Sequence, residues 1–380
     1  MIVIYLSLNA QITTNSWEWF FLVIFVYIGL YIFLIGFLSN FLGLFILLEA
    51  QVIVFLLLTQ LENNSVINIE TIARWCLLNI VSSLFLMISF GLLYEYYGTI
   101  NLVDLLILDI DASYGNKLAF SLFYSSFLFK IGIPPFHFWL PDVYETSNLQ
   151  LVTILIAPIK LFYIIVLQIF ILTNSEISYV FQVIGFISMT IGLLITLNQF
   201  VIKRFLAWTG IFYFGAFLIL MSNINLENIF YLKIYINLYL VSSLIFVLIN
   251  QINIYRLSDF IFVFGDNSLA GLFFLALLII IIGLPVMAGF FSKLVFYYSL
   301  ISSNISYIVV LILLTFTSFA GFYYLNTYIY SLSFKYLLQN NNLLEKLNCK
   351  INVLIYLIIL LIFFIMFYPY QMSYLFLYLI

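Results

Sequence analysis

The chain has 380 residues, of which 66% are hydrophobic and 7% are charged. Soluble domains carry roughly 25% charged residues, so this composition excludes a single water-solvated core, and the mean hydropathy of +1.24 predicts a membrane protein surrounded by lipid. The formal net charge of −3 provides no basic surface for nucleic acid, which is therefore not an expected partner.

Long apolar segments recur along the whole chain. A helix needs about 20 apolar residues, at a rise of about 1.5 Å each, to cross a bilayer. The sequence therefore predicts an all-α polytopic membrane protein with about eleven transmembrane helices. The predicted spans are 18–38, 41–61, 71–94, 118–138, 149–172, 179–198, 205–222, 228–251, 268–300, 305–330 and 351–370. The segment 268–300 is interrupted by Gly283 and Pro285, so it is either one discontinuous helix or two short ones.

The basic residues outside the spans predict the orientation. With eleven spans, one face holds Arg74, Lys203, Arg204, Arg256, Lys335, Lys346 and Lys350, and a loop on the other face holds Lys117. The positive-inside rule then places the N-terminus on the matrix or cytoplasmic side. Residues 1–16 contain no lysine or arginine, which predicts neither a transit peptide nor a standard signal peptide.

One segment, residues 129–145, combines a lysine, a double proline and the chain's only histidine in the sequence FKIGIPPFHFWLPDVYE. Proline lacks the amide hydrogen that would bond the carbonyl four residues earlier. We therefore expect Pro134 and Pro135 to free the carbonyls of Lys130 and Ile131. In hydrocarbon each freed group costs several kcal/mol unless neighbouring helices or water satisfy it. Apolar residues continue on both sides of Lys130, so this cation is expected inside the membrane.

Other charged residues also fall in the middle of predicted spans: Glu49, Lys160 and Lys293 join Lys130. A buried carboxylate and a buried ammonium stabilise each other, whereas an isolated one favours its neutral form. One glutamate among three lysines leaves at least one lysine able to load and release a proton, which arginine could not do. Intramembrane charges typically mark ion pathways, so we predict proton transfer; ion pairs that only fix helix packing are the alternative. His137 either passes protons to the loop or is a packing residue.

Two segments share a glycine–aliphatic–proline interruption close to a lysine. The predicted helix breaks involve Gly132, Pro134 and Pro135 after Lys130, and Gly283 and Pro285 before Lys293. Paired interrupted segments in two halves of a chain point to the repeat-built pathway of a transporter.

No join between spans resembles a soluble domain, so a single membrane domain over residues 1–380 is predicted. Residues 41–200 would form a first half-repeat with Glu49 and Lys130. Residues 201–330 would form a second with Lys293, and residues 331–380 a polar join and a C-terminal helix.

Metal and redox sites are not predicted for this chain. Cys76 and Cys349 lie far apart with no second ligand near either, so both are expected to be incidental thiols. Asp104, Asp109 and Asp111 are spaced like a metal-binding run, but they lie in a polar join, which favours a solvated loop. Iron–sulfur, haem and flavin motifs are absent from the sequence, so no cofactor is expected on this chain.

The motif residues resemble the antiporter-like subunits of respiratory complex I, and most closely the subunit 2 type of NADH dehydrogenase in its mitochondrial form. The resemblance extends over roughly residues 41–300 and is carried by residues 129–144, 202–207 and 283–293. The Asp-Val-Tyr ending at residues 142–144 is the part that points away from subunits 4 and 5.

This resemblance implies specific roles. Glu49 and Lys130 would form the acid–lysine pair of a first half-channel, Lys160 would be a connecting lysine, and Lys293 would end a second half-channel. The implied fold is an antiporter-like inverted repeat with two discontinuous helices. The implied function is proton translocation coupled to quinone reduction, as a subunit of NADH:ubiquinone reductase.

The resemblance also implies partners and a location. The partners would be the other membrane-arm subunits of complex I, membrane lipid and protons. FMN, iron–sulfur clusters and ubiquinone would belong to the complex as a whole, and this chain would hold no redox site. The location would be the mitochondrial inner membrane, with several spans and the N-terminus on the matrix side.

The sequence departs from the family pattern at two places. Tyr213 stands where the family commonly has a histidine, and residues 146–149 read TSNL in place of a glycine- and proline-rich loop. Two other functions stay open: a subunit of a multi-subunit cation/proton antiporter, and a non-conducting structural scaffold.

Overall fold

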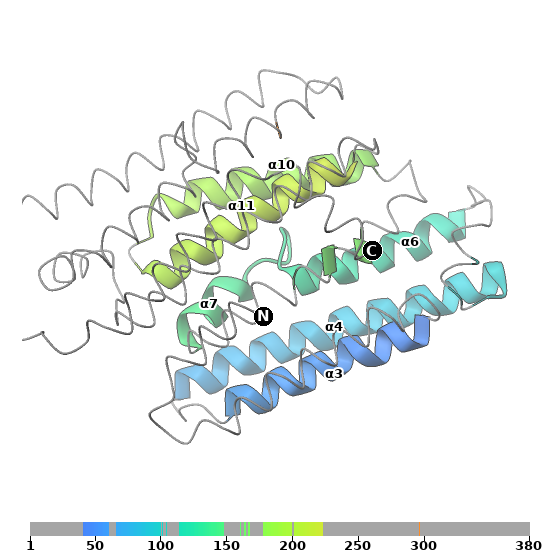
Figure 1. Cartoon of the computed structure of the whole chain (residues 1–380), viewed down its shortest axis with the longest axis horizontal. Helices are drawn as coiled ribbons and strands as arrows, with labels where there is room; N and C mark the ends of the chain where they lie inside the picture. Colours follow the sequence, from blue (N-terminus) through green and yellow to red (C-terminus); the bar gives the residue numbers. More distant parts are fainter. Residues whose placement is uncertain are drawn as a thin grey trace, which may run out of the picture. The chain divides into compact units, whose positions relative to one another are not determined.

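The computed structural model describes residues 41–60, 66–99, 101, 104, 114–147, 160, 163–164, 166–167, 178–199, 201–222 and 296. Its helices within these residues are α3 (Phe41–Gln60), α4 (Val66–Tyr97), α6 (Tyr114–Ile131), α7 (Trp139–Thr146), α10 (Ser178–Thr196) and α11 (Ile202–Ser222), drawn as ribbons in Figure 1. The chain divides into two compact units, residues 1–177 and 178–380. Helices α3 to α7 belong to the first unit, and α10 and α11 belong to the second.

Part of the predicted span pattern lies within the described residues. The predicted spans 41–61, 71–94, 179–198 and 205–222 correspond to α3, α4, α10 and α11, with ends that differ by a few residues. Three helical stretches there are long and apolar enough to cross a membrane: Glu70–Tyr97, Tyr179–Thr196 and Ile202–Ser222. The predicted spans 18–38, 228–251, 305–330 and 351–370 lie outside the described residues, as do nearly all of 149–172 and 268–300.

The prediction of one span over residues 118–138 is wrong at its C-terminal end. Helix α6 begins at Tyr114 and ends at Ile131, and a separate eight-residue helix, α7, follows from Trp139 to Thr146. The early end has a local cause, because Gly132 adopts a φ of +81°. Only glycine visits this left-handed region routinely, and it commonly ends helices there.

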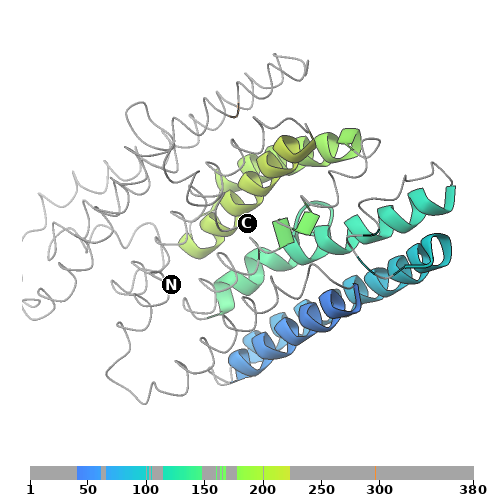
Figure 2. The ribbon, with the colours of Figure 1, turned by 45° about the vertical axis from the view of Figure 1, so that its right-hand side comes forward.

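Aromatic rings join the helices of the first unit. Phe41 of α3, Phe90 of α4 and Phe123 of α6 form a cluster with ring centroids 4.5 to 6.5 Å apart. Each such pair contributes about 0.5–1.5 kcal/mol beyond its buried area. Helix association in a bilayer relies on packing of this kind, since lipid tails are as apolar as the side chains. Figure 1 and Figure 2 both show α3, α4 and α6 running side by side.

The short helix α7 is attached to α4 at both of its ends. The Trp139 ring lies 6.5 Å from that of Trp75, centroid to centroid. At the other end the hydroxyl oxygens of Thr71 and Thr146 are 3.0 Å apart and share a hydrogen bond. Trp75 and Thr71 are four residues apart on α4, so they face the same side of that helix.

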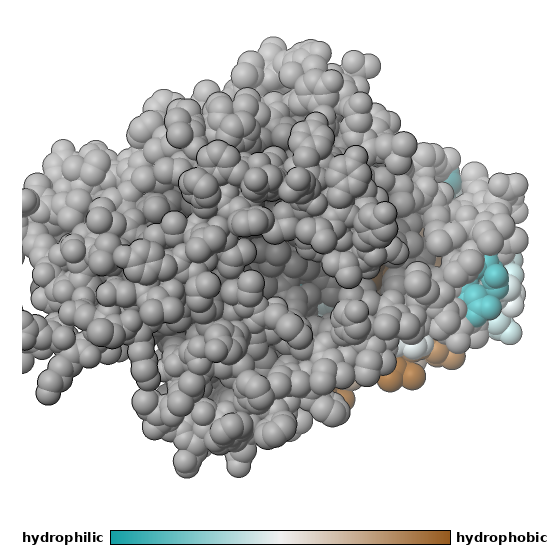
Figure 3. All heavy atoms as spheres, viewed as in Figure 1, coloured by the Kyte–Doolittle hydropathy of each residue, from teal (hydrophilic) through white to brown (hydrophobic). Residues whose placement is uncertain are grey.

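Apolar side chains cover an outer face of α4. Its exposed large hydrophobic residues are Leu77, Ile80, Val81, Leu84, Met87 and Ile88. Figure 3 shows exposed hydrophobic residues in brown and hydrophilic ones in teal along the coloured edge of the molecule. Apolar side chains facing outward suit a helix that lies against lipid or another membrane helix.

In the second unit, α10 and α11 pack closely through small residues. A Cβ atom on Gly215 of α11 would clash with the Ser188 hydroxyl and lie 2.7 Å from the carbonyl oxygen of Gly185, both on α10. One turn further along, a Cβ on Gly192 would lie 3.0 Å from the backbone nitrogen of Phe212. Glycine at these contacts lets the two backbones approach each other.

Candidate functional site

A glycine cap separates α6 from α7. The amide of Ile133 donates to the carbonyl of Leu128 at 3.1 Å, and the amide of Gly132 donates to the carbonyl of Phe129 at 3.2 Å. These two bonds, with a left-handed glycine between them, form a Schellman motif. The Pro134–Pro135 peptide bond that follows is cis.

Of the three residues predicted to break the helix, Gly132, Pro134 and Pro135, it is Gly132 that ends it first. The helix ends at Ile131, before Pro134 can interrupt it, because Gly132 turns the chain first. The carbonyl that receives a side-chain donor is that of Phe129, and the donor is the indole Nε1 of Trp139 at 3.2 Å. The Phe129 carbonyl thus accepts two donors, the amide of Gly132 and the indole of Trp139.

Side chains on the two sides of the break hold it together. The Phe129 ring at the end of α6 stacks on Phe136 with centroids 3.5 Å apart. The Trp139 side chain is almost completely buried between Phe129 and Trp75. The end of α6, where Lys130 lies, is therefore fixed by the first residue of α7.

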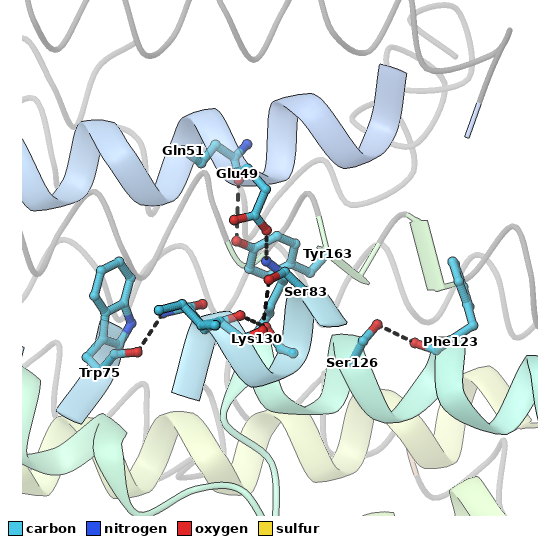
Figure 4. A network of polar contacts seen from close by, with 11 residues as sticks. Glu49, Gln51, Trp75, Ser83, Phe123, Ser126, Lys130 and Tyr163 are labelled. Carbon is cyan, nitrogen blue, oxygen red and sulfur yellow. Dashed lines mark hydrogen bonds and ion pairs between the residues drawn. The ribbon is translucent and has the colours of Figure 1, made fainter. Parts of the chain in front are cut away.

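Lys130 and Glu49 form an ion pair between α6 and α3. The Lys130 Nζ lies 3.5 Å from Glu49 Oε1, and the lysine side chain is 0% exposed whereas that of glutamate is 31% exposed. Figure 4 shows the two side chains pointing toward each other from their helices. Lys130 also occupies the last turn of α6, where the partial negative charge of the helix end favours a cation. The site thus places a buried lysine amine beside a partly exposed carboxylate.

Lys160 lies on the other side of the break, next to α7. It is 2% exposed, and its Nζ is 5.2 Å from the centroid of the Tyr144 ring. An ammonium over an aromatic face gains about 0.5–2 kcal/mol. Tyr144 belongs to α7, so Lys130 and Lys160 flank the interruption, one at each half-helix.

His137 lies in the segment between the half-helices. It is 6% exposed, its ring centroid is 4.3 Å from that of Phe138, and its carbonyl accepts the amide of Leu140 at 3.2 Å. These contacts place His137 in the turn that begins α7. Its role in proton transfer stays a prediction.

Two polar residues beside the ion pair were not singled out by the sequence. The hydroxyl of Tyr163 donates to Gln51 Oε1 at 3.3 Å, and Figure 4 shows both next to Glu49. A signal existed for Gln51, since it is a polar residue in an otherwise apolar segment. Tyr163 is one of 29 tyrosines and carried no distinguishing signal.

Some of the remaining predicted residues lie within the part of the chain that the structure describes, and others lie outside it. Lys293, Gly283 and Pro285 lie outside the described residues, as do Asp109, Asp111 and Cys349. Among the described residues, no three histidine, cysteine or acidic side chains gather where a metal ion could bind. Asp104 accepts a hydrogen bond from Asn101 at 3.0 Å on the surface, and Tyr213 is buried in α11.

The Trp139 hydrogen bond leads to a prediction for the break. Trp139→Phe keeps an aromatic ring but removes one of the two donors to the Phe129 carbonyl, and one such hydrogen bond contributes about 0.5–1.5 kcal/mol. We expect faster amide hydrogen exchange at residues 129–133 in the solubilised protein. Trp75→Phe is the control, because it alters the ring packed on Trp139 and keeps the hydrogen bond. Equal protection of these amides in both variants would contradict the proposed function of the indole.

A 29% identical curated relative is NADH-quinone oxidoreductase subunit N 2 of Hydrogenobaculum sp. (strain Y04AAS1), over 67% of this chain and 56% of the relative. The chain thus spans little more than half the length of this relative.

Solved structures share the fold. A chain of respiratory complex I from Thermus thermophilus matches with a TM-score of 0.74 at 21% identity, over 96% of this chain and 83% of that one. A chain of the Mrp complex from Dietzia sp. DQ12-45-1b matches with a TM-score of 0.69 at 18% identity, over 76% of this chain and 57% of that one. The family model described as "NADH:quinone oxidoreductase/Mrp antiporter, TM" matches residues 39–321. The chain therefore belongs to this family of antiporter-like helical membrane proteins.

Proposed function

We propose that the chain is a proton-translocating membrane-arm subunit of an NADH:quinone oxidoreductase of the complex I type. The observation that supports this most is the ion pair of Lys130 and Glu49 at the interrupted helix, in a chain of this family. The curated relative is a subunit of an NADH-quinone oxidoreductase. A buried lysine–glutamate pair supports a proton-transfer role because both side chains can gain or lose a proton.

In this proposal the ion pair controls the proton on Lys130. The Glu49 carboxylate stabilises the ammonium in a region where an unpaired charge is costly. When Glu49 is neutralised or drawn away, the ammonium loses its counter-charge and releases the proton toward Lys160. A lysine can perform this exchange because it is stable as a neutral amine, whereas arginine stays charged.

The proposal extends to the rest of the chain. It includes eleven helices and a second interruption at Gly283 and Pro285 that carries Lys293, related to the first by a pseudo-twofold axis in the membrane plane. It also includes a mitochondrial inner-membrane location with the N-terminus on the matrix side. FMN, iron–sulfur clusters and ubiquinone would be bound by other subunits of the complex.

A second candidate is a subunit of a multi-subunit cation/proton antiporter. It is favoured by the family description, which names the Mrp antiporter alongside the oxidoreductase. The two candidates differ in what accompanies the chain. An oxidoreductase subunit requires redox partners, whereas an antiporter subunit requires a second cation such as sodium.

Purification in mild detergent tests the proposed function. We expect the chain in a large complex that oxidises NADH and reduces a quinone, because apolar helix faces such as that of α4 suit burial against other subunits. The measurement is mass spectrometry of the co-purified proteins together with NADH oxidation. A stable monomer or homodimer would contradict the proposal, and a complex without NADH oxidation whose proton flux requires sodium would favour the antiporter.

A further inference from the structure

Two polar side chains lie beside the ion pair and have no part in the mechanism proposed above. Gln51 follows Glu49 by two residues on α3, and its Oε1 accepts the hydroxyl of Tyr163 at 3.3 Å. Tyr163 is 4% exposed, and its ring centroid lies 6.1 Å from that of Phe127 on α6. A phenol buried against α6 and bonded to α3 is held on both sides.

The position of Tyr163 relates it to both lysines. It follows Lys160 by three residues in a stretch whose described residues are helical, and residues three apart lie on the same face of a helix. The charge of Glu49 also acts on the Tyr163 hydroxyl, as expected from the side chains in Figure 4. The hydroxyl therefore lies near the Glu49–Lys130 pair and on the helical face that holds Lys160.

The hydrogen bond to Gln51 also orients the hydroxyl. A phenol has one donor hydrogen and acceptor lone pairs. The bond directs the hydroxyl hydrogen at Gln51 Oε1 and so fixes the resting orientation of the phenol oxygen. Gln51 cannot be a lasting proton acceptor itself, since its amide is not ionisable, so its effect is on the orientation of the phenol.

We propose that Tyr163, oriented by Gln51, relays a proton between the Glu49–Lys130 pair and Lys160. This inference rests on the proposed function of the ion pair. The hydroxyl first turns its hydrogen from Gln51 toward the neutral Lys160 amine. The phenol oxygen then accepts a proton from the Lys130 ammonium as its original hydrogen transfers to Lys160. One O–H bond forms as another breaks, so the phenol is neutral before and after, Lys130 ends neutral and Lys160 ends charged.

Two variants of the assembled complex in proteoliposomes test the relay. Tyr163→Phe keeps the ring against Phe127 and removes the hydroxyl; we expect proton pumping per quinone reduced to fall about tenfold, below the usual range for a positioned proton-transfer group. Gln51→Met keeps the side-chain length and removes the acceptor, with a smaller expected loss. Since both act through one hydrogen bond, the double variant is expected to be no worse than Tyr163→Phe alone.

Two further measurements separate a relay from a packing role. Tyr124→Phe is the matched control, because it removes the same atom from another buried tyrosine of this unit, and it is expected to pump normally. In deuterated water we expect a larger solvent isotope effect on pumping in Tyr163→Phe than in the unaltered complex, because the proton step becomes limiting. A role in packing alone would leave the isotope effect unchanged.

Comparison with Lys130→Ala distinguishes failure of the relay from failure of the proposed function. If Lys130→Ala stops pumping while Tyr163→Phe and Gln51→Met both pump normally, the relay is overturned and the proposed function stands. If Lys130→Ala also pumps normally, the proposed function fails. If Tyr163→Phe does not assemble, Gln51→Met decides: reduced pumping with a raised isotope effect supports the relay, and normal pumping overturns it.

Discussion

Lys130→Ala is expected to abolish proton pumping in the assembled complex, and Glu49→Gln is expected to lower it about tenfold, below the usual range for loss of a positioned acid or base, because Lys130 itself remains. Lys130→Ala removes the group that holds the proton, and the remaining Glu49 carboxylate faces a buried site with no cation from α6. Glu49→Gln keeps the shape of the side chain but removes the charge 3.5 Å from the ammonium. Quinone reduction coupled to pumping should fall together with it.

The measurement is pumping per electron in proteoliposomes, with NADH oxidation by a hydrophilic artificial acceptor as the internal reference. Removing one partner of a buried pair can cost about 3–5 kcal/mol, so assembly is checked first by native electrophoresis. Lys117→Ala and Glu95→Gln are matched controls, because both residues are exposed at the ends of α6 and α4. An assembled Lys130→Ala complex with normal pumping per electron would rule out a conducting role for this site.

Gly132→Ala is expected to destabilise the helix break by about 2–4 kcal/mol, combining backbone and contact effects. The φ of +81° is costly for any residue with a Cβ atom, and that atom would lie 2.7 Å from Leu140 Cδ1 and 3.3 Å from Trp139 Cζ2. Both side chains begin α7, so relief of the contact must displace the half-helix. The measurement is the yield and the thermal inactivation temperature of the complex.

Two other glycines separate the causes of this effect. Gly98 has a φ of +66° and open space around a Cβ, so Gly98→Ala tests the backbone cost alone. Gly91 lies inside α4 with open space around it, and Gly91→Ala should stabilise that helix by up to about 1 kcal/mol. If Gly132→Ala were no more harmful than Gly98→Ala, the contact with Leu140 would not matter.

Hydropathy predicted the helices that consist of one uninterrupted apolar segment. The length and composition of such a segment determine whether it can cross a membrane. The ends of α10 and α11 lie within a few residues of the predicted spans. The stretch after Ile131 was harder, because Gly132, Pro134 and Pro135 were all predicted to break the helix and the sequence does not show that Gly132 ends it first. Helix α7 escaped prediction because its eight residues are too few for a span and follow a proline-rich turn.

Only the charged residues of the candidate site could be predicted from the sequence. Glu49 and Lys130 stood out because charged residues are rare in apolar segments. The partnership of Tyr163 and Gln51 joins positions 112 residues apart, and apolar side chains surround these helices on all sides. No periodic pattern therefore indicates which face of each helix meets the other.

The attachment of α7 to α4 has a mechanical consequence. Trp139 and Thr146 attach both ends of α7 to one side of α4. A movement of α4 would therefore carry α7 with it as a rigid body. A sliding of α4 along its axis would shift the Tyr144 ring, whose centroid lies 5.2 Å from Lys160 Nζ. The same movement would pull on the Phe129 carbonyl through the Trp139 indole. A displacement of α4 would thus change the surroundings of Lys130 and Lys160 together. It would act on Lys130 through the Trp139 hydrogen bond and on Lys160 through the Tyr144 ring.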